Sequence, residues 1–168
     1  MPIAWRELPV TRALARRPFD CGNDDLNRYL SRFAVTNHRT RAALTYLALA
    51  RERDDELLGY YTVCPTQIEY RDLPAEFTER LGKYPVGGYR LARLAVDLKR
   101  QGEGLGAQLL FAAGIRCWRA STEAGGTVLL IDAKNQDIAN WYMRFGAAKL
   151  LDDPHRLVIS LRQFARLL

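Results

Sequence analysis

The sequence predicts an α/β protein in which a mixed, mostly antiparallel central sheet is flanked by helices. Short apolar runs that suit buried strands alternate along the chain with stretches of helical spacing. One region, Leu91–Trp118, combines a strand, a glycine-rich loop and a long helix. No repeat, low-complexity tract or linker interrupts the order, and the length suits one hydrophobic core. We therefore expect a single domain over residues 1–168.

The first half of the chain predicts three strands and one helix. Ile3–Val10 suits a strand, and Asn23 is a good N-cap for the helix that follows. Leu44–Ala50 and Leu57–Val63 flank a charged turn and predict a β-hairpin, in which Pro65 closes the second strand. The apolar face of the helix is formed, at helical spacing, by Leu26, Tyr29, Leu30, Phe33 and Ala34.

The second half predicts the remaining helices and strands. A proline introduces a short helix, and the glycine-rich loop leads into a long helix that ends at two glycines. A buried strand, another helix and a closing pair of strands follow. In order, these elements are Ala75–Leu81, Leu94–Val96, Leu105–Glu123, Thr127–Asp132, Asn135–Gly146, Ala148–Leu151 and Arg156–Leu161.

Charge and cysteine content narrow the functional classes. The formal net charge of +6 comes mostly from arginine, which binds phosphate bidentately and suits a polyanionic partner, although surplus charge can equally serve solubility. Cys21, Cys64 and Cys117 lie far apart without histidines nearby, so we expect neither disulfides nor a metal site. No apolar run approaches the ~20 residues that span a bilayer, and no signal peptide is recognisable. We therefore expect a cytoplasmic protein that does not enter membranes.

The glycines of Leu91–Trp118 predict an anion-binding loop. Glycine lets the backbone approach a ligand and adopt positive φ, and the amides at the start of the next helix lack partners inside that helix. A P-loop is excluded because alanine and glutamine follow Gly106, where lysine and a hydroxyl residue are needed. The dinucleotide fingerprint is excluded because Gly102, Gly104 and Gly106 are spaced by two.

The loop fits the pattern Q-x-x-G-x-G/A and resembles the acyl-coenzyme A loop of the GNAT acetyltransferase superfamily. The resemblance implies a GNAT fold in which the loop amides hold the pyrophosphate of acetyl-CoA, and the preceding strand pairs with the pantetheine arm. A structural turn rich in glycine is the alternative for the loop taken alone. The implied cofactor-binding residues are Leu94, Ala95 and Val96 in the strand and Gln101, Gly102, Glu103, Gly104, Leu105 and Gly106 in the loop.

A second stretch, Asn135–Gly146, resembles the GNAT pattern N-x-x-A-x-x-x-Y-x-x-x-G. Tyr142 lies seven residues after Asn135, which places both on one face of a helix. The resemblance implies that Asn135 binds the pantetheine or nearby backbone, and that Tyr142 is the general acid that protonates the leaving thiolate. Ile138 and Ala147 depart from the pattern in ways that repacking accommodates. The alternative for Tyr142 is a core aromatic.

A third segment, Phe19–Asn27, together with Arg93–Asp97 and the glycine loop, resembles the GNAT toxins of toxin–antitoxin modules, such as the TacT group. The resemblance covers nearly the whole chain. It implies acetylation of the α-amino group of aminoacyl-tRNA and a ribbon-helix-helix antitoxin as partner, and it allows a homodimer. One mismatch is Glu103, since these toxins often carry a basic residue at this position. A carboxylate that faces the pyrophosphate would be unfavourable for cofactor binding.

An α-amine is the acceptor that the residues favour. Such an amine, with a pKa about 8, is partly neutral at pH 7, whereas lysine at about 10.4 needs a strong base. Neither motif contains an evident base, although Glu69 or a water could serve. A strand amide, that of Val96, is expected to meet the oxyanion. Candidates for tRNA phosphate contacts are Arg39, Arg41 and Arg93.

Two other functions stay open from the sequence. The chain could acetylate a small amine, an antibiotic or a protein amine. It could also be a GNAT-like module that binds acyl-CoA or a partner without turnover, which Glu103 would help to explain.

Overall fold

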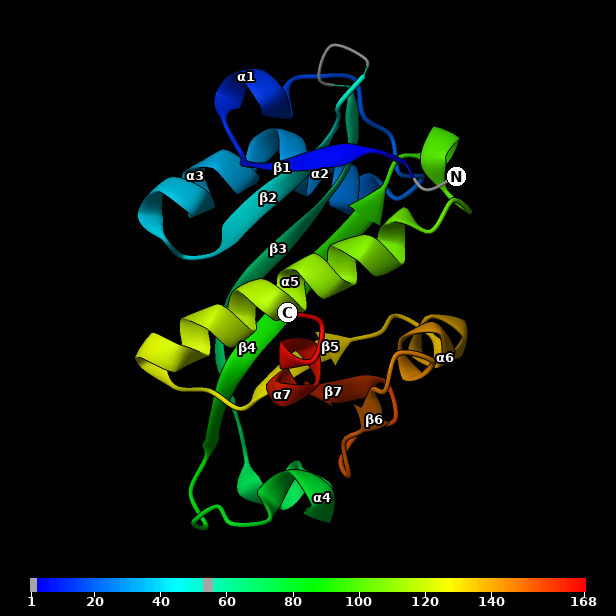
Figure 1. The fold of residues 1–168 in the computed structure, drawn as a ribbon. Coiled ribbons are helices and arrows are strands. Elements are labelled where there is room, and N and C mark those ends of the chain that lie inside the picture. The colour runs from blue at the N-terminus through cyan, green and yellow to red at the C-terminus, as the bar shows by residue number, and fades with distance from the viewer. Residues whose placement is uncertain (1–2, 53–55) are drawn as a thin grey trace. The chain divides into compact units, whose positions relative to one another are not determined.

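Figure 1 shows a computed structural model of the chain, which describes residues 3–52 and 56–168. Its strands are β1 (Trp5–Pro9), β2 (Leu44–Ala50), β3 (Leu57–Ile68), β4 (Val86–Val96), β5 (Val128–Asp132), β6 (Ala148–Lys149) and β7 (Arg156–Ser160). Within the described residues these strands form a sheet of order β1-β2-β3-β4-β5-β7-β6. The β4–β5 pair is parallel, and the β1–β2, β2–β3, β5–β7 and β6–β7 pairs are antiparallel. The mixed, mostly antiparallel sheet predicted from the sequence is confirmed.

The same residues form seven α-helices and two short 3₁₀ turns. The helices are α1 (Arg12–Ala15), α2 (Asp24–Arg32), α3 (Ala34–Thr40), α4 (Ala75–Thr78), α5 (Leu105–Ala124), α6 (Gln136–Met143) and α7 (Leu161–Ala165). Asn23 caps α2 as predicted, because its Oδ1 accepts the Leu26 amide at 3.0 Å. The chain as a whole divides into two compact units, Met1–Cys64 with Ala92–Ala113 and Pro65–Leu91 with Gly114–Leu168.

The first unit packs α2 and α3 against the apolar side of its strands. Polar groups inside this core are paired: the Thr45 and Thr62 hydroxyls, both fully buried, lie 2.7 Å apart, and the Tyr60 hydroxyl donates to the Leu26 carbonyl. Phe19 packs edge-on against Tyr60. The core includes Val10, Ala15, Cys21, Tyr29, Leu30, Ala34, Leu47, Leu49, Leu57, Tyr60 and Ala95.

The second unit has a separate core. It forms between β5, β7 and the segment that precedes β4, with Phe77 and Leu81 packed against its edge. The β5 run Val128–Ile131 is almost fully buried, as its unbroken apolar sequence predicts. The buried residues are Ile68, Leu73, Val86, Val128, Leu130, Leu150 and Val158.

Several predicted element ends are wrong, among them the start of β4, which lies at Val86 and not at Leu94, and two further ends have a local explanation. β3 continues to Ile68 through Pro65. Its pairing with β2 ends at Val63, so the missing amide of Pro65 breaks no bond on that side. The short helix that begins at Ala75 ends at Thr78 instead of Leu81, because Glu79 leaves the helical region with ψ 131° and Arg80 then adopts left-handed backbone with φ 67°.

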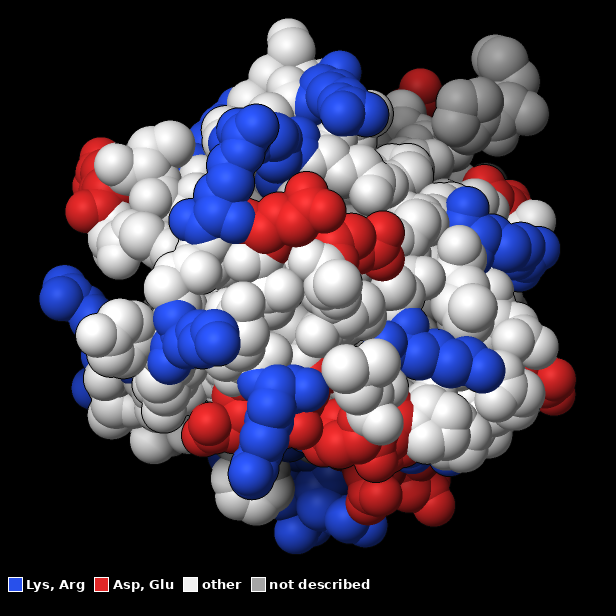
Figure 2. All heavy atoms as spheres, turned by 90° about the horizontal axis from the view of Figure 1, so that it is seen from below, with Lys and Arg blue, Asp and Glu red and all other residues white. Residues whose placement is uncertain are grey.

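Charged side chains are dispersed over the face of the molecule that Figure 2 shows. On the face drawn in Figure 2, basic side chains lie among acidic ones and uncharged surface, so the net charge of +6 is not gathered there into one patch. Cys21 and Cys117 are buried free thiols, and Cys64 is a half-buried one. No helix in residues 3–52 and 56–168 is long and apolar enough to cross a membrane, and no cluster of His, Cys, Asp and Glu in those ranges suits a metal ion.

Candidate active site

The glycine loop has the backbone that an anion site needs. Gly102 and Gly104 have φ of 82° and 85°, and a Cβ built on either would meet no atom within 4 Å. The glycines therefore serve backbone conformation and leave open space above the loop. α5 begins immediately afterwards at Leu105 and runs for 20 residues, so its first amides face the same side without acceptors in the helix. A phosphate group would satisfy both features.

Gln101 fixes the start of this loop. Its Nε2 donates to the Val96 carbonyl at 2.9 Å and to the Cys21 carbonyl at 3.1 Å. One side chain thus ties the loop to the end of β4 and to the segment before α2. These two bonds explain the first residue of the Q-x-x-G-x-G pattern, since the two N–H groups on Nε2 each reach one carbonyl.

Asp97 also holds the loop in place, although the sequence alone assigns no function to its side chain. Its Oδ2 accepts the Asp20 amide at 3.1 Å and its Oδ1 accepts the Lys99 amide at 2.9 Å. Its own amide donates to the Leu58 carbonyl, and the Leu98 amide donates to the Asp20 carbonyl. The side chain is buried, so these bonds replace lost hydration. An aspartate directly before a short turn is a capping signal that could have revealed it.

The Phe19–Asn27 segment has a structural role in this corner. Asp20 Oδ1 accepts the Gly22 amide at 2.8 Å and the Asn27 side-chain amide at 2.9 Å, and these two bonds, that of Asn27 first, lower the pKa of Asp20. Asn27 Oδ1 in turn accepts the Cys21 amide at 3.0 Å. The segment is therefore a hydrogen-bonded turn that meets the loop through Asp97 and Gln101.

Glu103 projects from the loop into solvent. Its charge contributes to the raised pKa of Arg100, although the main cause is the hydrogen bond from Arg100 to Glu56 at 3.0 Å. A solvent-exposed carboxylate interacts with a nearby anion largely through water, whose high dielectric constant weakens the repulsion. The mismatch at this position is therefore compatible with a phosphate site.

The predicted pantetheine strand is the end of β4. Leu94 and Val96 are half-buried and share one face, whereas Ala95 between them is 4% exposed and belongs to the core. Gly59 lies against this point, because a Cβ there would sit 2.6 Å from the Ala95 carbonyl oxygen. Glycine at 59 thus permits close approach of the backbone at the predicted site.

Asn135 and Tyr142 lie in the second unit, at the start and near the end of α6. Asn135 Oδ1 accepts the Ile138 amide at 2.9 Å, so this residue is the N-cap of the helix. Tyr142 is 7% exposed and its ring packs edge-on against Trp141 at 4.9 Å. Burial raises the pKa of the Tyr142 hydroxyl, so the phenol stays protonated. Within the described chain that hydroxyl makes no hydrogen bond, which leaves it able to donate to a ligand.

The three arginines chosen as tRNA contacts lie in the first unit and differ in their surroundings. The Arg93 guanidinium stacks over the Tyr29 ring, 3.6 Å from its centroid, in a cation–π contact. Arg39, in the last turn of α3, and Arg41, its left-handed C-cap with φ 64°, are both exposed. Exposed guanidinium groups at a helix end are available to phosphate without a rearrangement.

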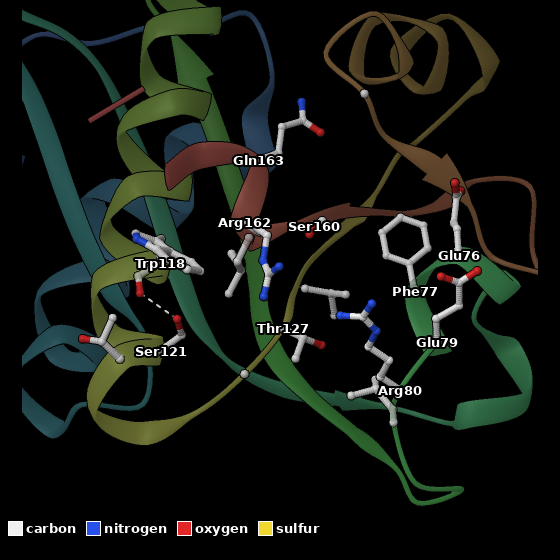
Figure 3. A pocket seen from close by; sticks show the side chains of 16 residues that line it. Glu76, Phe77, Glu79, Arg80, Trp118, Ser121, Thr127, Ser160, Arg162 and Gln163 are labelled. Atoms are coloured by element: carbon white, nitrogen blue, oxygen red, sulfur yellow. Dashed lines mark hydrogen bonds between the residues drawn. The ribbon is translucent and has the colours of Figure 1, made fainter. Parts of the chain in front are cut away.

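A pocket of about 750 Å³ lies in the second unit, and its lining contains none of the predicted site residues (Figure 3). Two arginines, Arg80 and Arg162, and two glutamates, Glu76 and Glu79, line it, so its lining has no net charge that would select an anion. Ser121 is already bonded to the Trp118 carbonyl at 2.6 Å. The remaining lining residues are Phe77, Leu81, Thr122, Gly126, Thr127, Val128, Gly146, Ser160, Leu161 and Gln163.

Comparison with known proteins identifies relatives of the whole chain. No family model matches it. A curated relative, the tRNA-acetylating toxin of Mycobacterium tuberculosis, is 29% identical over 144 residues, which is 86% of this chain and 84% of the relative. The stretch shared with this relative is therefore long enough to contain both predicted motifs.

Solved structures agree over nearly the full length. KacT, solved as a tyrosine-to-phenylalanine variant, has a TM-score of 0.89 at 24% identity and covers 98% of this chain and 99% of its own. AtaT complexed with acetyl-methionyl-tRNAfMet has a TM-score of 0.86 at 27% identity, covering 97% and 98%. Other AtaT structures contain acetyl-CoA, the antitoxin AtaR or DNA. The chain is therefore similar in sequence to a tRNA-acetylating toxin and to AtaT, and it shares the fold of KacT and AtaT, the acetyltransferase toxins of toxin–antitoxin modules.

Proposed function

We propose that this protein transfers the acetyl group of acetyl-CoA to the α-amino group of aminoacyl-tRNA and thereby blocks translation. The observation that carries the proposal is the loop in which Gly102 and Gly104 take positive φ with open space above them, directly before the unpaired amides of α5. The M. tuberculosis relative is a tRNA-acetylating toxin, and AtaT has been solved with acetyl-CoA and with an acetylated aminoacyl-tRNA.

In this proposal the cofactor is held by the glycine loop, by the end of β4 and by Asn135. The amides of Gln101–Gly106 bind the pyrophosphate, and Leu94, Ala95 and Val96 pair with the pantetheine. Because Asn135 Oδ1 is used as a helix cap, only its Nδ2 is left to donate to the cofactor. Bound acetyl-CoA supplies the activated acetyl group, and the chain's own groups position it and stabilise charge.

The proposed reaction needs no covalent enzyme intermediate. The neutral α-amine attacks the thioester carbonyl carbon, a C–N bond forms, the C–S bond breaks, and the amine loses a proton to water. The Val96 amide stabilises the oxyanion. Tyr142 acts as general acid toward the departing sulfur. Since burial raises its pKa, its O–H stabilises the thiolate by hydrogen bonding before any full proton transfer.

The proposed partners follow from the same assignment. Arg39, Arg41 and Arg93 contact tRNA phosphates, at two exposed positions and one stacked on an aromatic ring. A ribbon-helix-helix antitoxin neutralises the protein, and the active form is a homodimer in the cytoplasm, where charged tRNA is found. AtaT and KacT have both been solved in antitoxin or DNA complexes.

Labelled acetyl-CoA incubated with charged tRNA tests the proposal. Wild-type protein is expected to label the aminoacyl group. Tyr142→Phe should lower kcat by about 10²- to 10⁴-fold while calorimetry shows unchanged acetyl-CoA binding. Tyr84→Phe, at a tyrosine that is 77% exposed, is the matched control and should retain wild-type rates.

The alternatives predict other outcomes. Transfer only to free polyamines, antibiotics or protein amines would replace the tRNA assignment with another acetyltransferase function. Binding of acetyl-CoA without transfer to any acceptor would favour a non-catalytic module. Equal rates for Tyr142→Phe and wild type would remove Tyr142 from the mechanism.

A further inference from the structure

We propose that Asp132 is a positioning residue that fixes the start of α6 and, through it, the Tyr142 hydroxyl. This inference rests on the proposed function, because it assigns a role in acetyl transfer to a residue outside both motifs. Asp132 is the last residue of β5, three residues before the Asn135 cap.

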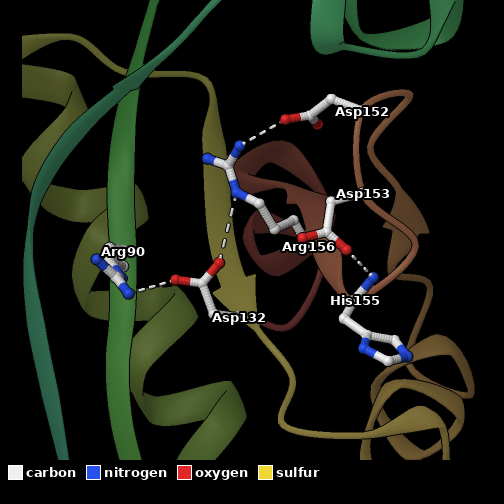
Figure 4. A network of polar contacts seen from close by, with 6 residues as sticks. All are labelled: Arg90, Asp132, Asp152, Asp153, His155 and Arg156. Atoms are coloured by element: carbon white, nitrogen blue, oxygen red, sulfur yellow. Dashed lines mark hydrogen bonds and ion pairs between the residues drawn. The ribbon is translucent and has the colours of Figure 1, made fainter.

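Asp132 is shared by two arginines from two neighbouring strands (Figure 4). One carboxylate oxygen, Oδ2, pairs with Arg90 on β4, and the other, Oδ1, lies 3.5 Å from Nε of Arg156 on β7. Arg156 also pairs with Asp152 at 3.0 Å. Positive and negative side chains alternate in this series of ion pairs, so each one lies next to a group of opposite charge. The series is Arg90, Asp132, Arg156 and Asp152.

This network stands where the backbone ladder between β4 and β5 stops. The last pairs in that parallel ladder are Arg90 with Leu130 and Leu91 with Ile131. Asp132 therefore has no backbone partner from β4 in that ladder, and its side chain reaches back to Arg90 instead. On its other side Asp132 faces Arg156 in the β5–β7 register. The two ion pairs hold the end of β5 from both sides after the β4 ladder has ended.

Backbone bonds carry this restraint into the β5–α6 connection. The residue after Asp132, Ala133, donates its amide to the His155 carbonyl at 2.8 Å. The His155 amide is held by Asp153 Oδ1 at 2.8 Å, in the same turn as Asp152. The connection to α6 is thus fixed against the β6–β7 turn, and only Lys134 separates this anchored point from the Asn135 cap.

Helix α6 connects the fixed point at Ala133 to the Tyr142 hydroxyl, so a tilt at its start displaces that hydroxyl. Tyr142 lies seven residues beyond Asn135, roughly 10 Å along the helix axis. A tilt of about 6° at the start would move the far end by about 1 Å, and misplacement on that scale can cost about 10²-fold in rate. The burial of Ala139 at 0% exposure resists part of the tilt, so we expect about a tenfold loss.

The network is exposed enough for its removal to leave the fold intact. The four side chains are between 32% and 46% exposed, and pairs of that exposure contribute little to global stability. A loss of rate without a loss of fold is therefore the signature of positioning. A purely structural surface cluster would show neither a kcat effect nor a dependence on Tyr142.

The test uses the full chain with charged tRNA and acetyl-CoA. Asp132→Asn should lower kcat about tenfold with the acetyl-CoA KM changed less than twofold. In the Tyr142→Phe background the same substitution should lower kcat less than twofold further, since a residue that acts through Tyr142 has nothing left to position. Glu123→Gln, an exposed carboxylate at the end of α5, is the matched control and should leave all constants unchanged. Arg90→Gln, which keeps the Arg156 pair with Asp152, should give a smaller loss than Asp132→Asn.

Hydrogen exchange provides a readout that does not depend on catalysis. Asp132→Asn should speed amide exchange within residues 133–146 and leave residues 24–40 unchanged. Unchanged kcat, or losses that multiply fully with Tyr142→Phe, would overturn the inference. If wild-type protein acetylates no tRNA, the proposed function fails. The exchange measurement then decides the positioning role by itself: unchanged exchange in 133–146 refutes it and faster exchange supports it.

Discussion

Substituting Asp97 by alanine tests whether the glycine loop depends on its side-chain anchor. The substitution removes two hydrogen bonds to a buried carboxylate, from the amides of Asp20 at 3.1 Å and Lys99 at 2.9 Å. At about 1.5 kcal/mol for each bond to a charged acceptor, the loss is about 3 kcal/mol. For a chain of 168 residues this lowers Tm by about 6 to 12 °C.

The same loss should reach coenzyme A binding. If all of the about 3 kcal/mol held the loop in its binding conformation, the affinity for coenzyme A would fall about 150-fold. A fall of about tenfold is the smallest effect that is consistent with an anchoring role for Asp97. Calorimetric titration with coenzyme A, at a temperature where the variant is folded, measures this. Asp25→Ala is the control, because its carboxylate is 81% exposed and makes only a surface pair with Arg28. Wild-type affinity in a folded Asp97→Ala protein would show that the anchor does not shape the site.

Three further predictions concern the glycine loop, a buried hydroxyl pair and alkaline pH. Gly104→Ala forces a residue with a side chain to adopt φ near 85°, which costs about 1 kcal/mol. The affinity for coenzyme A in calorimetry should therefore fall about fivefold, and an unchanged affinity would mean that the loop relaxes. Thr45→Val and Thr62→Val should each cost about 1 to 3 kcal/mol in urea unfolding, and the double variant less than their sum, because each single change strands one buried hydroxyl; strict additivity would contradict the pairing. Burial raises the pKa of Tyr60 and Tyr142, so the folded state holds protons that the unfolded state releases above about pH 10. This stability is complete below that pH and is lost as pH rises further, and alkaline melting curves that stay flat to pH 12 would contradict it.

The parts of the fold that could be predicted are those whose signal lies in neighbouring residues. The buried run of β5, the Asn23 cap and the glycines that end α5 are each readable from neighbouring residues. The start of β4 was not, since Val86–Gly88 looks like a turn. Gly88 is needed there because a Cβ would lie 2.4 Å from the Val128 carbonyl oxygen, a contact that only the tertiary structure reveals.

The candidate site divides in the same way. The glycine loop and the Asn135–Tyr142 spacing are local motifs, so both can be predicted as site residues from the sequence. Asp97 and Asp132 act through partners far away in sequence: Asp20 is 77 residues from Asp97, and Arg90 is 42 residues from Asp132. Asp97 carries a local capping signal before the turn Leu98–Arg100, but nothing local marks its bond to Asp20 or the pairing of Asp132 with Arg90. Periodicity and spacing could not distinguish them from solvated turn residues.

This difference bears on how the two motifs work. In the proposed function each motif supplies groups that contact the cofactor, but each also depends on partners outside the motif for its position. Gln101 relies on carbonyls of residues 21 and 96, and the α6 cap follows a connection tied to the β6–β7 turn. A glycine loop gains access to a ligand by giving up side-chain contacts, so its order must come from flanking polar residues. A variant that keeps both motifs but loses Asp97 or Asp132 should therefore be folded and poorly active. That result would place the determinants of activity in the residues that hold the motifs as well as in the motifs themselves.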